Sequence, residues 1–209
     1  MKNATIECLV LGMVSTSTWL IQNKETKEVL IIDPADNASA IVRKVEQMGG
    51  VPKAVLLTHG HFDHIMAADD LRDAYDIPIY AYADEKMVLT NARINLSGSW
   101  ASPYTLDVDC VVRDNDSMQL AGFDIQVLHT PGHTLGSCCY YIKEEGVLFS
   151  GDTLFAGSIG RTDFPTSNMG HMRASLRRLL TNLPGETVVY PGHGEETTIA
   201  YEKRYNPFA

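Results

Sequence analysis

An apolar run at residues 54–57 leads directly into seven residues, 58–64, that hold three histidines and an aspartate. A short apolar run of this kind is typical of a buried strand, and the polar segment after it is expected on the loop where the strand ends. Such loops are held by a rigid sheet and often carry catalytic residues. Imidazole and carboxylate groups together suit zinc, iron and manganese. A catalytic metal takes about three protein ligands, so four ligand-type residues on one loop indicate more than one metal.

The same pattern recurs three times later in the chain. Predicted strands at 125–128, 147–149 and 188–190 are each followed by a turn that contains glycine and by one ligand-type side chain. Together with the first loop, these turns hold five of the seven histidines. The candidate metal ligands are His59, His61, Asp63, His64, His133, Asp152 and His193.

The order of these motifs resembles that of the metallo-β-lactamase superfamily, and the resemblance covers nearly the whole chain. It implies a four-layer αββα sandwich in which the four loops meet along one edge. A length of 209 residues suits one such α/β domain. We therefore expect a single metallo-hydrolase domain over residues 1–209, without a separate C-terminal helical substrate domain.

Hydrophobic periodicity predicts the elements of this sandwich. Strands are expected at 7–11, 18–22, 29–32, 54–57, 77–80, 117–120, 123–128, 138–142, 147–149 and 187–190. Helices are expected at 38–48, 65–75, 84–90, 172–183 and 195–204. Asp84 is the predicted N-cap of the helix at 84–90. Residues 91–109 show no period and are expected to form a long functional loop.

Composition limits the class of partner and the compartment. A net charge of −9 disfavours nucleic acid, whose phosphates are bound by Lys and Arg. No apolar run approaches the ~20 residues that span a bilayer, and residues 1–5 do not begin a signal peptide. The four cysteines lack zinc-finger spacing, and Cys138 and Cys139 are expected to be buried on opposite faces of a strand. We therefore expect a cytoplasmic protein that binds neither membrane nor nucleic acid, and no pattern points to a particular oligomeric state.

The resemblance assigns a role to each candidate ligand. It implies two divalent metals, with zinc as the first expectation and iron or manganese as alternatives at either site. Three residues would hold the first metal: His59, His61 and His133. Three others would hold the second: Asp63, His64 and His193.

Catalysis would then fall to Asp152, which bridges the two metals, and to Asp63, which orients a metal-bridging hydroxide or carries a proton. Zinc lowers the pKa of bound water to about 7, so hydroxide is available at neutral pH to attack a carbonyl carbon. The resemblance also suggests that Asp33, at a strand end, supports a metal-binding histidine, while a plain turn residue before Pro34 is the alternative. His129 is either a second supporting residue or a packed side chain.

Residues 152–165 resemble the short bacterial members of the glyoxalase II branch, which are hydroxyacylglutathione hydrolases. The likeness implies a small-molecule thioester as substrate, S-lactoylglutathione above all. A leaving thiolate beside zinc is chemically reasonable, because thiolates are good zinc ligands. Arg161 is the candidate for a glutathione carboxylate, because its guanidinium offers a bidentate fork. Its alternative role is to pair with Asp163 and shape the loop.

Two other activities use the same motifs. The persulfide dioxygenases of the superfamily hold one iron with two His and one Asp, which here would be His59, His133 and Asp152. Two departures argue against this assignment: Ile159 stands where these enzymes commonly have Cys, and the last motif lacks their Ala-His-Asp form. A metallo-lactonase would need only a different pocket around the same metals. A non-enzymatic binding module would be expected to have lost some ligands, and none is lost.

Overall fold

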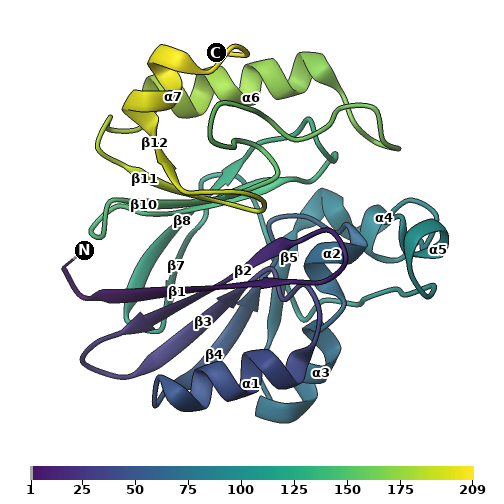
Figure 1. The fold of residues 1–209 in the computed structure, drawn as a ribbon, viewed down its shortest axis with the longest axis vertical. Coiled ribbons are helices and arrows are strands. Elements are labelled where there is room, and N and C mark those ends of the chain that lie inside the picture. The colour runs from purple at the N-terminus through teal and green to yellow at the C-terminus, as the bar shows by residue number, and fades with distance from the viewer. Residues whose placement is uncertain (1) are drawn as a thin grey trace.

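Two six-stranded sheets pack face to face in the computed structural model, which describes residues 2–209, and helices cover both outer faces (Figure 1). Met1, the first residue of the opening segment considered above, lies outside the described residues. The order of the first sheet is β1-β2-β3-β4-β5-β6, and β3 to β6 run parallel to one another. Its strands are β1 (Ala4–Leu11), β2 (Thr16–Asn23), β3 (Glu28–Ile32), β4 (Val51–Leu56), β5 (Ile79–Tyr82) and β6 (Cys110–Val112).

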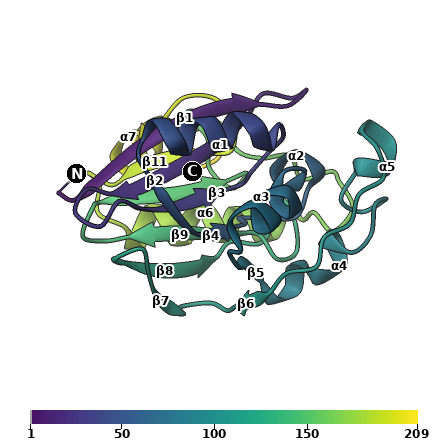
Figure 2. The ribbon, with the colours of Figure 1, turned by 90° about the horizontal axis from the view of Figure 1, so that it is seen from below.

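The order of the second sheet is β12-β11-β10-β9-β8-β7, with β10 and β11 as its parallel pair. Its strands are β7 (Ser117–Leu120), β8 (Phe123–His129), β9 (Cys138–Ile142), β10 (Val147–Gly151), β11 (Val188–Pro191) and β12 (Thr197–Thr198). Figure 2, seen from below, shows the strands of both sheets running in similar directions. The four loops that follow β4, β8, β10 and β11 carry the candidate metal ligands and are called the motif loops, numbered in chain order.

The helices are divided between the outer faces and one end of the sandwich. In Figure 1, α1 and α3 cover the first sheet, α6 and α7 cover the second, and α4 and α5 lie beside the sheet edge. Their bounds are α1 (Ala38–Gln47), α2 (Phe62–Ile65), α3 (Ala68–Tyr75), η1 (Ala83–Glu85), α4 (Lys86–Leu89), α5 (Ser97–Trp100), α6 (Met169–Asn182) and α7 (Ile199–Tyr205).

Side-chain alternation explains the four layers. Successive residues of a strand point to opposite faces of the sheet. In β3, Leu30 and Ile32 belong to the core between the sheets, whereas Val29 and Ile31 pack with α1 and α3 on the outer face. A third cluster lies between β8 to β11 and the helices α6 and α7. All four of these β3 residues are buried, so both faces are covered and the predicted αββα sandwich is confirmed.

Hydrogen bonds join the two sheets near the motif loops. The indole of Trp19 on β2 donates to the carbonyl of Pro191 on β11 at 2.8 Å. The hydroxyl of Tyr140 on β9 donates to the carbonyl of Leu57 at 2.9 Å, and the amide of Cys138 donates to the carbonyl of Thr58. The start of the first motif loop is therefore attached to the second sheet.

Several boundary predictions were wrong. The helix expected at 65–75 is divided into α2 and α3, and the one expected at 195–204 begins only at Ile199. Asp84 caps no helix, because it lies inside the 3-10 turn η1, whose N-cap is Tyr82. The loop expected at 91–109 contains the short helix α5, and β6 follows it.

The prediction for the paired cysteines is confirmed. Cys138 lies in the core between the sheets and Cys139 in the cluster under α6 and α7. Among residues 2–209, no helix combines the length and the apolar character that crossing a membrane requires.

Candidate metal centre

The loop after β4 supplies four of the candidate ligands. His59 lies three residues beyond the end of β4, and His61 is the N-cap residue of α2, a single helical turn that carries Asp63 and His64. Placing this turn immediately after a parallel strand directs all four side chains to the same edge of the sandwich. The three histidines are almost fully buried, and Asp63 is partly exposed.

The second sheet supplies the other three. His133 lies in the turn after β8, Asp152 follows Gly151 at the end of β10, and His193 follows β11. Since β10 and β11 run parallel, their C-terminal ends meet at the same edge. Asp152 is 9% exposed and His193 is more open.

These seven side chains form two groups. The ligand atoms of His59, His61 and His133 all lie within 4.8 Å of one another, as do those of Asp63, His64 and His193. In the first group, His61 Nδ1 and His133 Nε2 are 2.8 Å apart. In the second, Asp63 Oδ2 lies 3.4 Å from His64 Nε2 and 3.3 Å from His193 Nε2.

Asp152 lies between the two groups. Its Oδ2 is 3.4 Å from His133 Nε2 in the first group and 3.5 Å from His193 Nε2 in the second. Its Oδ1 is 3.4 Å from His64 Nε2. The structure thus brings all seven predicted residues together and gives Asp152 contacts on both sides.

The polar atoms at the centre of the cluster fit divalent cations. Among residues 2–209, three of these buried atoms have no hydrogen-bond partner: His59 Nε2, His64 Nε2 and Asp152 Oδ1. A buried polar atom without a partner costs free energy, and such atoms require an explanation. Convergent imidazole and carboxylate atoms of this kind are the donors that zinc and iron prefer.

Asp33 orients two of the histidines. Its Oδ2 accepts from His64 Nδ1 at 2.9 Å and from the Thr58 hydroxyl at 2.6 Å, and its Oδ1 accepts from the Thr58 amide. The Thr58 oxygen in turn lies 3.1 Å from His59 Nδ1. Because the Thr58 hydrogen points to Asp33, its oxygen accepts from His59. Both histidines therefore direct an Nδ1 hydrogen away from the cluster and leave Nε2 facing it.

A backbone carbonyl does the same for the third histidine. His133 Nδ1 lies 2.8 Å from the carbonyl oxygen of Arg161, which can only accept. The proton is therefore on Nδ1, and Nε2 is free to bind a metal. This contact also joins the turn after β8 to the segment that follows β10.

Burial keeps the first group neutral. It lowers the pKa of His59 well below its usual value, the pKa of His61 to about 3, and the pKa of His133 in the same direction. Neutral imidazoles are the form that binds metals.

Carboxylates control the second group. Burial lowers the pKa of His193, but Asp152 and Asp63 outweigh it and raise that pKa to about 9. Burial also raises the pKa of Asp63, but His64 and His193 outweigh it and hold the pKa at about 2. At neutral pH the second group therefore holds an ionised carboxylate beside protonated histidines, and a metal that binds there must displace their protons.

Two glycines permit the close packing of the loops. A Cβ on Gly192 would collide with Asp152 Oδ1 and would lie 2.7 Å from His64 Cε1. Gly151 has a φ of +48°, which L side chains rarely adopt, and a Cβ there would collide with Thr58. The glycines of the two turns are thus required by the approach of the first motif loop.

Glu85 was not identified by the sequence analysis. It is fully buried on η1 and accepts hydrogen bonds from Gly60 and Gly136 amides at 2.7 and 2.8 Å and from the Thr134 hydroxyl at 2.9 Å. Burial raises its pKa to about 7. It joins the first motif loop to the turn that carries His133. A lone glutamate before a helix gives no sequence signal for such a role.

His129, the candidate supporting residue, and Arg161, the candidate substrate-binding residue, lie outside the cluster of seven ligand-type residues. His129 stacks on Tyr82 with ring centroids 4.1 Å apart, and its Nε2 donates to the carbonyl of Leu135, so these contacts are packing contacts. Arg161 pairs with Asp163 through two hydrogen bonds of 2.9 and 2.8 Å and lies 4.1 Å from the centroid of the Phe164 ring. Its side chain nevertheless lines the cavity at the cluster.

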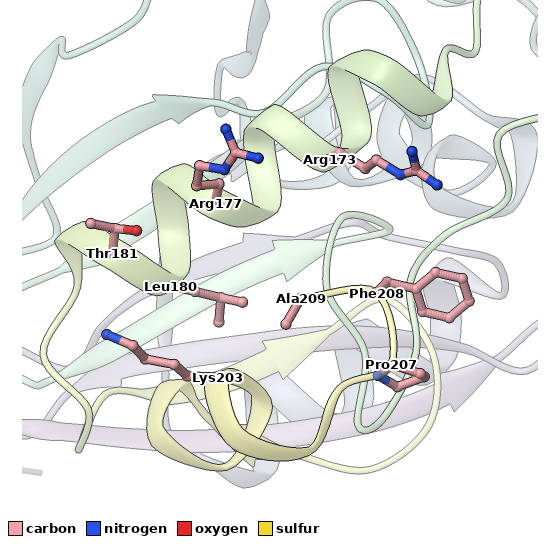
Figure 3. A pocket seen from close by; sticks show the side chains of 8 residues that line it. All are labelled: Arg173, Arg177, Leu180, Thr181, Lys203, Pro207, Phe208 and Ala209. Atoms are coloured by element: carbon pink, nitrogen blue, oxygen red, sulfur yellow. The ribbon is translucent and has the colours of Figure 1, made fainter.

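That cavity has a volume of about 320 Å³ and reaches five of the seven candidate ligands. A separate groove of about 440 Å³ lies between α6 and α7 and shares no lining residue with it. Figure 3 shows Arg173 and Arg177 extending from α6 in this groove, with Lys203 on α7 opposite. Arg178, their neighbour, instead pairs with Asp114 at 2.8 Å.

The sequence model of the Metallo-beta-lactamase superfamily matches residues 11–193, which include all seven candidate ligands. The chain belongs to this superfamily. The assignment agrees with the observed fold and with the loops that carry the ligands.

Two curated relatives match over nearly their whole length. The probable metallo-hydrolase YqgX of Bacillus subtilis is 38% identical over 200 residues, which cover 95% of this chain and 94% of the relative. The hydroxyacylglutathione hydrolase GloC of Haemophilus influenzae is 34% identical over 209 residues, which cover 97% of each chain. The superfamily and these relatives identify the chain as a metal-dependent hydrolase of the glyoxalase II-like branch.

Three solved structures show the same fold. BLEG-1 B3 metallo-beta-lactamase is similar with a TM-score of 0.92, 38% identity and coverage of 98% of this chain and 99% of that one. TTHA1623 in a di-iron-bound form is similar with a TM-score of 0.85 and 36% identity, over 97% of this chain and 100% of that one. ETHE1 from Myxococcus xanthus is similar with a TM-score of 0.79 and 33% identity, over 97% of this chain and 83% of that one.

Proposed function

We propose that the protein is a dinuclear metal hydrolase that cleaves thioesters, with S-lactoylglutathione or a related hydroxyacyl-glutathione as substrate. The observation that carries the proposal is the position of Asp152 between two complete groups of ligand-type residues. The first metal would be held by His59, His61 and His133, and the second by Asp63, His64 and His193. Asp152 would contact both.

Bound divalent metals supply Lewis-acid polarisation of a carbonyl and activate water at neutral pH. Zinc is the metal that we propose first, and the di-iron form of TTHA1623 supports iron as an alternative. The protein's own contribution is to fix the donors before metal and substrate arrive. Asp33 and the Arg161 carbonyl hold three imidazoles in the tautomer that leaves Nε2 free.

Asp63 is the residue that we propose to orient the water. Its pKa of about 2 keeps it ionised at neutral pH, and the Thr16 hydroxyl donates to Oδ2 at 2.7 Å and fixes the carboxylate. An ionised carboxylate at the edge of the cavity orients a water molecule by accepting its hydrogen. The thioester carbon then gains the water oxygen, and the carbon–sulfur electron pair leaves with the sulfur.

The choice of thioester rests on likeness to the glyoxalase II branch. GloC, a hydroxyacylglutathione hydrolase, matches this chain from end to end at 34% identity. The side chain of Arg161 is 60% exposed and already binds the Asp163 carboxylate in a bidentate pair. A glutathione carboxylate would replace that of Asp163 and bind Arg161 in the same way. A cytoplasmic location belongs to the same proposal, and the four free cysteines among residues 2–209 support it.

The test is thiol release from S-lactoylglutathione by zinc-loaded protein, with Asp152→Ala as the blank and metal content measured on both. We expect about two metals per chain and rapid turnover in the wild type. Asp152→Ala should lose bound metal and activity together, whereas Asp124→Asn, an exposed carboxylate on β8, should keep both. Full metal retention by Asp152→Ala would contradict the bridging role. Faster hydrolysis of nitrocefin than of any thioester would overturn the substrate class.

A second candidate is a mononuclear iron persulfide dioxygenase, with His59, His133 and Asp152 as ligands. The likeness to ETHE1 at 33% identity favours it. The intact group of Asp63, His64 and His193 favours the dinuclear enzyme, because one iron would leave those three residues without a role. Oxygen consumption by iron-loaded protein with glutathione persulfide, in the absence of thioesterase activity, would decide for the dioxygenase. A lactonase would be recognised by hydrolysis of lactones in preference to thioesters.

A further inference from the structure

The cavity at the candidate metal centre has walls that are mainly apolar. Seven side chains form this apolar wall: Val14, Phe62, Leu96, Trp100, Phe155, Ile159 and Phe164. Among the described residues that line the cavity, Arg161 is the one with a permanent positive charge. Ligand cavities of this kind bind an apolar group and orient it with a few polar contacts.

Aromatic rings of the wall lie against both ligand groups. The ring of Phe164 is 5.4 Å from that of His61 and 6.0 Å from that of His133. The ring of Phe155 is 5.9 Å from that of His193. Any carbonyl held at the cluster therefore has its substituents next to an apolar surface.

Trp100 is held at the cavity by a fixed segment. The amide of Phe62, on α2, donates to the carbonyl of Asn95 at 2.9 Å. Asn95 is fully buried, and its side-chain amide donates to the carbonyl of Tyr104 at 2.8 Å. Trp100, on the helix that follows, is 54% exposed. Trp100 also lines the cavity, so its ring offers a large aromatic surface to a bound group.

Lactoylglutathione leaves most of this wall uncovered. Its acyl group offers one methyl and one hydroxyl, and its thiol carries two carboxylates and an ammonium group. The carboxylates match Arg161, which is paired with Asp163 and exposed at the mouth. Phe164 lies beside Arg161, 4.1 Å from its guanidinium. If the thiol portion extends toward Arg161, the rest of the apolar wall is left for the acyl group.

We propose that the preferred substrates are thioesters whose acyl group carries an aromatic or branched aliphatic substituent in place of the lactoyl methyl. This inference rests on the proposed thioesterase function and specifies its substrate class. The reaction is the same hydrolysis: the acyl carbon gains the water oxygen, the carbon–sulfur bond breaks, and the sulfur leaves as thiolate and takes up a proton.

The test compares two acyl groups on one thiol. In a hydrophobic pocket one methylene group changes kcat/KM by roughly 10- to 200-fold. Replacing the lactoyl methyl by phenyl, in S-D-mandeloylglutathione, should therefore raise kcat/KM at least tenfold. The same acyl pair on N-acetylcysteamine, which has no carboxylate, should show the same preference, because the acyl group and not the thiol carries it.

Trp100→Ala should lower the ratio of the mandeloyl to the lactoyl kcat/KM at least fivefold. Tyr201→Ala is the matched control, because Tyr201 is a similarly exposed aromatic residue, on α7, and does not line the cavity. A ratio near one in the wild type, or a ratio that Trp100→Ala leaves unchanged, would overturn the inference while leaving the thioesterase function in place.

Binding of the acid products separates the inference from the proposed function. D-mandelate should bind the metal-loaded protein at least tenfold more tightly than D-lactate in calorimetry, and Trp100→Ala should reduce that difference. This readout does not need turnover. Absence of hydrolysis of all four thioesters would reject the thioesterase proposal, and equal binding of the two acids would reject the apolar acyl pocket.

Discussion

A single carboxylate sets the orientation of two candidate ligands. Asp33 accepts directly from His64 and, through the Thr58 hydroxyl, from His59. From its sequence position, Asp33 is either a supporting residue or a turn residue before proline. Its contacts agree with the supporting role and add Thr58, whose hydroxyl was not considered because threonine is not a metal ligand.

Thr58→Val should weaken metal binding with little change of shape. Valine cannot accept from His59 Nδ1 or donate to Asp33, so the ring of His59 loses its fixed tautomer. Loss of such a supporting contact typically lowers metal affinity about 10- to 100-fold. Competition with a chelator measures the affinity, and Thr58→Ser, which keeps the hydroxyl, should remain near the wild-type value. Equal affinity of the Val variant and the wild type would refute the role of the hydroxyl.

Arg161 and Asp163 allow the two roles of Arg161 to be separated. Arg161→Ala should raise KM for glutathione thioesters several-fold and leave N-acetylcysteamine thioesters nearly unaffected, because only the former carry carboxylates. Asp163→Asn removes the competing carboxylate and should lower KM for the glutathione substrate. Steady-state kinetics of both variants test this expectation. An equal loss on both thiols in both variants would show that the pair only shapes the loop.

At this scale, the sequence predicts residues by chemical type and spacing. The seven candidate ligands were identified because histidine and aspartate recur at strand ends. Glu85 could not be identified, because its partners lie 25, 49 and 51 positions away and two of them are backbone amides. A hydrogen bond to a backbone amide leaves no trace in the partner's residue type.

Among the elements, η1 and the first motif loop depend on each other through Glu85. The folded protein raises the pKa of Glu85 to about 7, from 4.5 in an unfolded chain, chiefly by burial. The protonated form is therefore favoured by folding. This contribution to the free energy of unfolding is fully present below about pH 4.5 and is lost as the pH rises through about 7. The loss amounts to at most about 3 kcal/mol.

Glu85→Gln should remove this part of the pH dependence. The difference in free energy of unfolding between wild type and variant should change by about 3 kcal/mol or less between pH 4.5 and 8, with the wild type losing stability as the pH rises. Urea unfolding in the presence of chelator at each pH measures the difference, and contributions of other groups cancel. Asp124→Asn, at an exposed carboxylate on β8 that does not contribute to the pKa of Glu85, should run parallel to the wild type. Parallel curves for Glu85→Gln would contradict the raised pKa.

Several elements were predicted with correct or nearly correct ends, whereas the short elements within residues 91–109 were not. The strands β7 and β9 have the predicted ends, and α1 ends one residue earlier than expected. The region 91–109 has no period because α5 is a single turn held by Asn95 and by contacts to α2. Tertiary contacts, not local propensity, form such elements.

For the whole molecule, the metal centre lies where two sheets meet. The first sheet contributes His59, His61, Asp63 and His64, and the second contributes the other three candidate ligands. Each half of the chain can be predicted from its own pattern, but the distances between them depend on how the sheets pack. Hydrogen bonds such as Trp19 to Pro191 set that packing next to the site.

Metal binding should therefore stabilise the entire fold. A ligand that binds only the folded state adds about 4 kcal/mol at a free concentration 1,000 times its Kd. For a domain of this size, each kcal/mol raises Tm by about 2 to 4 °C, so zinc should raise Tm by roughly 10 °C over chelator-treated protein. Thermal unfolding at increasing free zinc measures the rise.

Magnesium, which prefers oxygen donors, should have little effect. Asp152→Ala should show a much smaller rise, because each metal loses the carboxylate between the sheets. A Tm that is independent of zinc would show that the two groups do not bind it in the folded state.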